Sequence, residues 1–173
     1  KDIADNNYKH CFVVNKLDHY IYTVMVRGQL VRIKPNTRTC ELLLKKVGTS
    51  TRPDACDSYC AFSPVKGQEN MLYIAMAEGN QIWRVDVGNL EGKDKKTYPG
   101  EGYAGKAIVE GQIAGKGWED GLLRNAKFNN PHQICFTEDG KLYIADCGNN
   151  CIRVIDTRLS IDKATVSTPI GLP

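Results

Sequence analysis

One stretch of this 173-residue chain occurs twice, and that repeat constrains the fold more than any other feature of the sequence. Residues 72–86 align with residues 142–156 at a constant offset of 70, without a gap. Leu, Tyr, Ile and Ala open both copies, and an Asn, an Ile and a final Asp also coincide. Residues 20–34 fit the same frame more loosely, at an offset of 52. Self-similarity of this kind is typical of repeat architectures.

Turn sequences divide the C-terminal copy into short strands. Asp139-Gly140 and Gly148-Asn149-Asn150 each separate two apolar runs, which is a strong hairpin signal. We therefore predict three consecutive antiparallel strands over 133–156, with turns at 138–140 and 148–150. Residues 164–167 supply a fourth, outer strand.

The same pattern predicts three four-stranded units, at about 8–48, 56–98 and 115–173. Expected strands lie near 11–15, 19–26, 29–34 and 39–45, then 58–63, 71–77, 81–87 and 95–98, then 133–137, 141–147, 151–156 and 164–168. Four short strands per repeat is the blade pattern of a β-propeller. No long amphipathic helix is visible, and 119–127 has room for one helical turn. The expected fold class is all-β.

A set of spaced motifs resembles the NHL repeat. They are Gly115-x-Gly117-x-x-Asp120-Gly121, Ala126-x-Phe128-Asn129-x-Pro131, Leu142-Tyr-Ile-Ala-Asp146 and Asn150-x-Ile152-Arg153. The resemblance implies that each unit is one blade of a propeller. Such propellers usually have about six blades, so three blades imply that the rest come from the same longer chain or from a dimer. Residues 168–173 look like the start of another repeat.

The resemblance also extends to bacterial cell-envelope NHL proteins, which often carry a TIG module, although none is visible here. It implies an extracytoplasmic location, periplasmic or at the cell surface. No apolar run approaches 18 residues, so no membrane span is expected. A net charge of +3 is too small to indicate a nucleic-acid partner by itself.

Seven cysteines do not fix the redox compartment. Cys11, Cys40 and Cys135 lie in apolar runs and are expected to be small core residues. Cys147 and Cys151 flank a short turn and are either a disulfide or two free thiols. Cys56 and Cys60 have no matching second pair, which makes a zinc site a weak interpretation.

The long segment 99–131 carries the first group of candidate binding residues, Tyr103, Trp118, Glu119 and Arg124. Trp118 either stacks on a sugar or peptide side chain or packs the loop onto its own blade. Asp120-Gly121 is expected to be a turn.

Histidines on the first strands form the second group. An ungapped match of 11–14 with 133–136 places His10 over His132. Pro131-His132 resembles the peptidyl-hydroxyglycine amidating lyases, which bind zinc through inner-strand histidines that follow a proline. Ser58 stands at the corresponding position of the second unit, whereas a catalytic zinc needs three protein ligands. We therefore expect no metal site and no cofactor, with the histidines lining a wet channel.

The leading functional hypothesis is a non-enzymatic binding scaffold that presents loops to a protein or glycan. One alternative is a metal-dependent lyase or hydrolase on the same fold. A second is an RNA-binding NHL domain, against which the mild charge and the lack of a dense basic–aromatic run argue.

Overall fold

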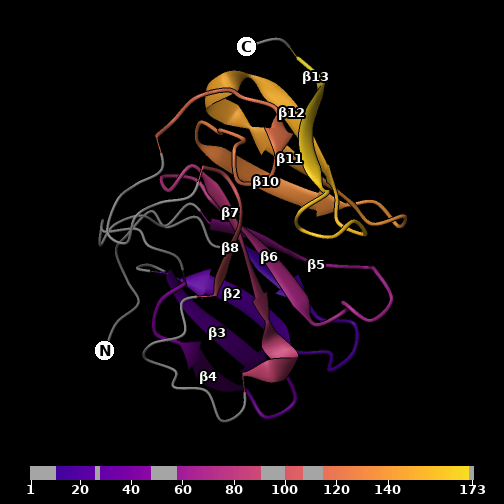
Figure 1. Cartoon of the computed structure of the whole chain (residues 1–173). Helices are drawn as coiled ribbons and strands as arrows, with labels where there is room; N and C mark the ends of the chain where they lie inside the picture. The colour runs from indigo at the N-terminus through magenta and orange to yellow at the C-terminus, as the bar shows by residue number, and fades with distance from the viewer. Residues whose placement is uncertain (1–10, 26–27, 48–57, 91–99, 107–114, 172–173) are drawn as a thin grey trace.

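Three antiparallel sheets follow one another along the chain and pack face to face (Figure 1). The computed structural model describes residues 11–25, 28–47, 58–90, 100–106 and 115–171. The first sheet contains β1 (Phe12–Val14), β2 (Ile21–Met25), β3 (Gln29–Lys34) and β4 (Thr39–Leu44). The second contains β5 (Ser58–Phe62), β6 (Met71–Met76), β7 (Gln81–Asp86) and β8 (Glu101–Ala104). The third contains β10 (Pro131–Phe136), β11 (Lys141–Asp146), β12 (Cys151–Asp156), β13 (Thr165–Ile170) and β9 (Gly121–Leu122).

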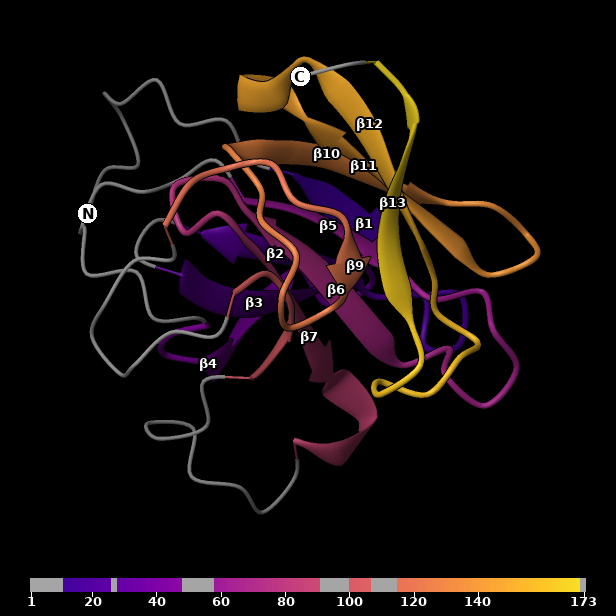
Figure 2. The ribbon, with the colours of Figure 1, turned by 45° about the horizontal axis from the view of Figure 1, so that its top comes forward.

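The first strand of each sheet lies beside the first strand of the next. β5 contacts β1 on one side and β10 on the other, as Figure 2 shows. The fold is therefore all-β, with blade-like sheets arranged around their first strands, as predicted for a β-propeller. No helix among the described residues is long and apolar enough to span a membrane.

The predicted strands over 133–156 are confirmed as β10, β11 and β12. The turn between β11 and β12 contains a single 3-10 turn, η3 (Cys147–Asn149). A similar turn, η2 (Val87–Asn89), follows β7.

Two strands between the second and third units were not predicted at their observed positions. The fourth strand of the second sheet is β8, at 101–104, so this sheet extends past the predicted limit of 98; residues 95–98 lie outside the described part of the chain. The helical turn expected within 119–127 is present, since the Ala126 amide donates to the Leu122 carbonyl at 3.0 Å. Immediately before it lies β9, a short strand that was not predicted and that pairs with the outer side of β13. Gly121 has a φ of 122° there, a conformation that side-chain-bearing residues rarely adopt.

The first sheet repeats the second, but a single offset of 52 does not align all of its strands. Its β2–β3 turn connects Met25 to Gln29, whereas the corresponding turn in the second sheet connects Met76 to Gln81 and is one residue longer. The offset is therefore 51 along β2 and 52 only from β3 onward. Because a one-residue slip moves every side chain to the opposite face, Tyr22 corresponds to Tyr73 rather than to Ile74.

Two hydrophobic clusters lie on the two sides of the middle sheet. Leu72 and Ile74 point toward the first sheet, and the intervening Tyr73 and Ala75 point toward the third. This alternation is the two-residue period of a strand that is buried on both faces. The predicted core positions at 72, 74, 82, 142 and 144 are confirmed, since none of these side chains is exposed.

The sixth predicted core position, Ile152, is only partly buried, which corrects that prediction. Its counterpart Ile82 is buried between the second and third sheets. On the third sheet the same face points away from the other two sheets. Tyr143, Ala145 and Val154 share it and are likewise only partly buried.

The predicted core role of three cysteines is wrong for two of them. Cys40 and Cys135 are exposed, and Cys11 is half-buried. Cys147 and Cys151 are free thiols, since Cys151 pairs across the ladder with Asp146 and not with Cys147. Cys60 is buried, whereas Cys56 lies outside the described residues.

Candidate binding groove and the loop of the third sheet

Arg153 on β12 holds the segment before β10 against the third sheet. Its guanidinium donates to the backbone oxygens of Glu119 and Lys127 and to the carboxylates of Asp120 and Asp146, each at 2.8 Å. The guanidinium also lies over the Phe128 ring, 4.9 Å from its centroid. These contacts bring the residues of the separate motifs together around one cation, which gives a physical reason for their spacing along this chain.

Asp146 completes this arrangement from β11. It accepts hydrogen bonds from the Asn129 amide and from the Asn149 side chain, both at 2.8 Å, as well as from Arg153. Asp146 and Arg153 both belong to the motifs that resemble the NHL repeat, but no contact between them was predicted. The sequence signal for this ion pair was an arginine in an otherwise apolar strand, with an aspartate on the neighbouring strand.

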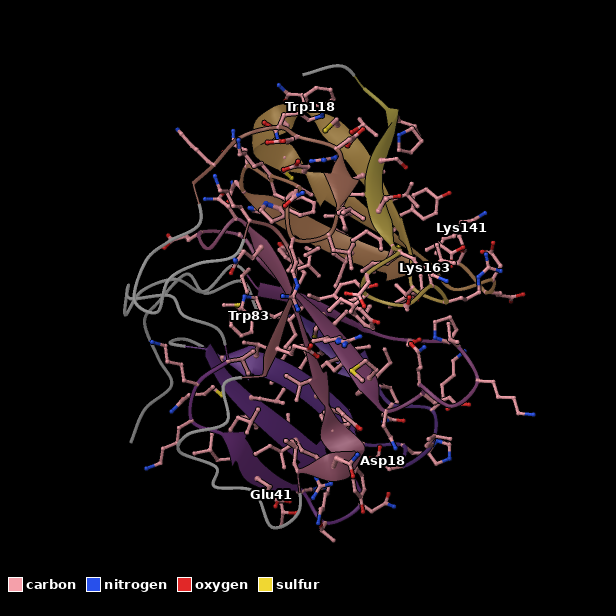
Figure 3. All side chains as sticks on the ribbon, viewed as in Figure 1. Asp18, Glu41, Trp83, Trp118, Lys141 and Lys163 are labelled. Atoms are coloured by element: carbon pink, nitrogen blue, oxygen red, sulfur yellow. The ribbon has the colours of Figure 1, made fainter. Side chains whose placement is uncertain are left out.

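The predicted loop residues are fixed to the third sheet rather than gathered into a pocket. Trp118 is 43% exposed, and its indole donates to Thr168 Oγ1 at 3.2 Å. The Glu119 carboxylate pairs with Lys127 Nζ at 2.8 Å, which lowers the pKa of Glu119. Arg124 is exposed and borders a shallow depression with Glu119 and Lys127. Figure 3 shows Trp118 at the far end of the third sheet, remote from Asp18 and Glu41 at the first sheet.

Tyr103 is not available to a ligand, which corrects its place among the candidates. It lies on β8, is 2% exposed and packs edge-on against Tyr73, with ring centroids 5.0 Å apart. Burial raises the pKa of the Tyr103 phenol. Tyr103 was expected in an open loop, whereas residues 101–104 form a strand.

His132 lies on β10, the first strand of the third sheet. Its ring packs against Tyr59 of β5 at 5.5 Å, and its buried Nε2 has no hydrogen-bond partner among the described residues. His10 lies outside the described part of the chain. No three His, Cys, Asp or Glu side chains converge as metal ligands within the described ranges.

A groove of about 460 Å³ runs across the C-terminal ends of the three first strands, which the sequence analysis did not identify. β1, β5 and β10 all contribute to it, together with the residues that follow them. The lining residues are Val13, Val14, Lys16, Cys60, Ala61, Phe62, Ser63, Pro64, Glu69, Ile134, Cys135, Phe136, Thr137 and Glu138. The available signal was that Val14, Phe62 and Phe136 end their strands at corresponding ladder positions.

The groove combines an apolar floor with a polar rim. Phe62 packs edge-on against Tyr22 at 5.1 Å, and Phe136 packs in the same way against Tyr73 at 5.2 Å. Each phenylalanine is thus held by a tyrosine of the preceding sheet, which fixes the floor. Lys16, Thr137 and Glu138 are exposed at the rim and supply charged and hydroxyl groups.

Comparison with protein-family models identifies one segment of the chain. Residues 128–155 match the model of the NHL repeat. The chain carries an NHL repeat. This segment contains Phe128, Asp146 and Arg153, so the NHL repeat includes the buried cation, its carboxylate partner and the ring beneath it.

The curated relatives and solved structures are longer than this chain. Protein SUPPRESSOR OF QUENCHING 1, chloroplastic, from Arabidopsis thaliana is 34% identical over 96 residues, which cover 55% of this chain and 8% of the relative. An auxiliary nutrient binding protein from Bacteroides ovatus has a TM-score of 0.68 at 20% identity, covering 91% of this chain and 35% of that one. A phosphatase candidate from Bacteroides thetaiotaomicron has a TM-score of 0.63 at 17% identity, with coverages of 91% and 35%. At these identities the solved structures establish the shared fold alone, and the NHL-repeat chain spans about a third of their length.

Proposed function

We propose that this chain is part of a non-enzymatic binding propeller that takes a glycan in the groove at the ends of β1, β5 and β10. The observation that carries the proposal is that all three sheets contribute to one groove through the same strand position. A site built from three sheets is a concave, largely pre-formed surface of the kind that binds small ligands.

The lining chemistry fits a ligand with an apolar face and a hydroxylated edge, as a sugar ring has. Phe62 and Phe136 offer ring edges and faces in the floor, and aromatic carbon is a common partner for the C–H face of a sugar. Lys16, Thr137 and Glu138 stand where hydroxyl groups would reach them. The nutrient-binding description of the Bacteroides ovatus neighbour is compatible with such a ligand.

We further propose that additional blades of the same kind cover the outer face of the third sheet, from a longer chain or a second copy. The support is the contrast between Ile82, which is buried by the next sheet, and its counterpart Ile152, which is partly exposed. We also propose that the protein lies outside the bacterial cytoplasm, because an extracellular glycan would reach it there.

The test is binding of the 173-residue chain to an array of plant, host and microbial oligosaccharides, followed by calorimetry on the positive sugars. Cys135→Trp would place a large side chain on the exposed groove floor, and Gln133→Trp is the matched control, exposed on the same strand but outside the groove. We expect the affinity for the sugar to fall at least tenfold in Cys135→Trp and to stay unchanged in Gln133→Trp.

Trp118→Ala separates the groove from the loop. If sugar binding is lost in this variant and kept in Cys135→Trp, the ligand binds at the loop of the third sheet and the groove assignment is wrong. If no sugar binds the wild-type chain, the glycan assignment fails.

A further inference from the structure

We propose that Cys11 and Cys60 form a redox-active dithiol, which a small disulfide oxidises to a disulfide bond joining the first sheet to the second. Neither the NHL repeat nor the proposed glycan groove assigns a role to these thiols. Cys11 immediately precedes β1, and Cys60 lies in the middle of β5. They therefore lie where the first strands of two neighbouring sheets run side by side.

The two cysteines contact each other reciprocally. The Cys60 amide donates to Cys11 Sγ at 3.5 Å, and the Cys11 thiol donates to the Cys60 carbonyl at 3.7 Å. The Cys60 thiol in turn donates to the Cys11 carbonyl at 4.0 Å. Each sulfur thus lies against the other residue's backbone, so the two thiols are held beside each other.

Exposure assigns different roles to the two thiols. Cys60 is 4% exposed, whereas Cys11 is half-buried. A reagent in solution therefore reaches Cys11 first, and Cys60 can react only with a sulfur already held beside it. Among the described residues, no other two cysteines contact each other's backbones in this way.

The local hydrogen bonds also favour Cys11 as the nucleophile. The hydrogen-bond interactions of Cys11 with the Cys60 side chain and with the Cys60 backbone lower the pKa of Cys11 to about 6, although partial burial opposes the shift. The pKa of Cys60 is raised by its hydrogen bond to Cys11 and by burial. A thiolate is the reactive form, so Cys11 is the nucleophile at neutral pH.

The reaction proceeds in two exchanges. The Cys11 thiolate attacks one sulfur of a small disulfide such as oxidised glutathione, forming a mixed disulfide and releasing one thiolate. Cys60 then loses its proton to solvent and attacks Cys11 Sγ, which forms the Cys11–Cys60 bond and releases the second thiol. The small disulfide gains two electrons and two protons, and the protein dithiol loses them.

The bond would matter to the groove, because Cys60 is part of its lining. Closing the bond draws β1 and β5 together at one wall of the groove. This consequence depends on the proposed binding function, whereas the disulfide itself does not, so failure of either can be recognised separately.

The primary experiment is a non-reducing tryptic map of the wild-type chain after incubation with oxidised glutathione. Cys11 falls in the tryptic peptide 10–16, and Cys60 falls in 47–66, which also contains Cys56. We expect peptide 10–16 linked to peptide 47–66, with the link disappearing on reduction. Absence of this linked pair under conditions that oxidise a model dithiol would overturn the proposal.

Two alanine variants assign the linked sulfur. The link must persist in Cys56→Ala and disappear in Cys60→Ala. The opposite result would show that Cys56 is the partner and would refute the pair proposed here.

The pH dependence of Cys11 alkylation by iodoacetamide gives an independent measurement. We expect a midpoint near pH 6 in the wild-type chain, and a higher midpoint in Cys60→Ala because the Cys60 side chain, the largest cause of the lowered pKa of Cys11, is gone. A wild-type midpoint near 8.5, that of an ordinary cysteine, would contradict the proposed environment.

Discussion

Arg153 and Asp146 form an ion pair in which neither side chain is exposed, with Nη1 2.8 Å from Oδ2. A buried pair is stable only when the remaining donors and acceptors are also satisfied. Three further oxygens around Arg153 and two further donors around Asp146 meet most of this requirement, and Arg153 Nε is the one buried nitrogen of the pair without a partner among the described residues. The pair therefore connects two strands of the sheet with the loop that precedes them.

Removing the cation should unfold the third sheet at much lower denaturant concentration. Arg153→Met leaves Asp146 buried without its charge partner, and breaking such a pair costs about 3–5 kcal/mol. Urea denaturation followed by circular dichroism measures the loss. Arg158→Met is the control, because Arg158 binds Asp156 on the exposed surface of the same sheet and should change stability far less. Equal effects of the two variants would show that the buried pair has no special role.

Two isoleucines at corresponding ladder positions should respond differently to truncation. Ile82 is fully buried between the second and third sheets, so Ile82→Ala should cost about 2–5 kcal/mol. Ile152 occupies the same position on the partly exposed outer face, and Ile152→Ala should cost clearly less. Similar losses in thermal and urea unfolding would mean that the outer face is covered in solution.

Acid should remove one surface interaction before it unfolds the chain. The Arg158 guanidinium binds both carboxylate oxygens of Asp156 and lowers the pKa of Asp156 to about 2. Because the folded pKa lies below the unfolded value of about 3.9, the contribution to stability is complete above that value and is lost as pH falls toward 2. The urea midpoint of the wild type should exceed that of Asp156→Asn at pH 5, and the difference should shrink toward pH 2. A difference that stays constant over this range would exclude the ionised carboxylate as its source.

Elemental analysis should find no stoichiometric zinc in the purified chain. A catalytic zinc needs three protein ligands, and His132 has no described His, Cys, Asp or Glu beside it in such a group. The lyase alternative depends on this residue. One zinc per chain that is lost in His132→Ala would support the lyase over the binding propeller.

The repeat made most strands predictable, because turn residues and apolar runs recur at a fixed spacing. Sequence alone did not show the missing residue in the β2–β3 turn, which shifts Tyr22 onto the position of Tyr73. It also did not show which faces are covered. Cys135 and Ile152 lie in apolar runs, yet their exposure is decided by whether another sheet packs on them.

The candidate site was less predictable than the fold. Trp118 is oriented by Thr168, which lies 50 residues further along the chain. Glu119 is oriented by Lys127, which belongs to no recognisable motif. The groove arises where three strands from separate repeats end side by side. Residues far apart along the chain produce it, so a search for local motifs could not find it.

The middle sheet has a consequence for how the molecule resists unfolding. Its two faces belong to different hydrophobic clusters, one shared with the first sheet and the other with the third. In such a linear array, stability is close to a sum of neighbour-to-neighbour terms. The outer sheets can therefore open separately, while opening β6 disrupts both interfaces at once. Amide protons of β6 and β7 should accordingly exchange with solvent more slowly than those of the flanking sheets, making the centre of the chain the last region to lose its protection.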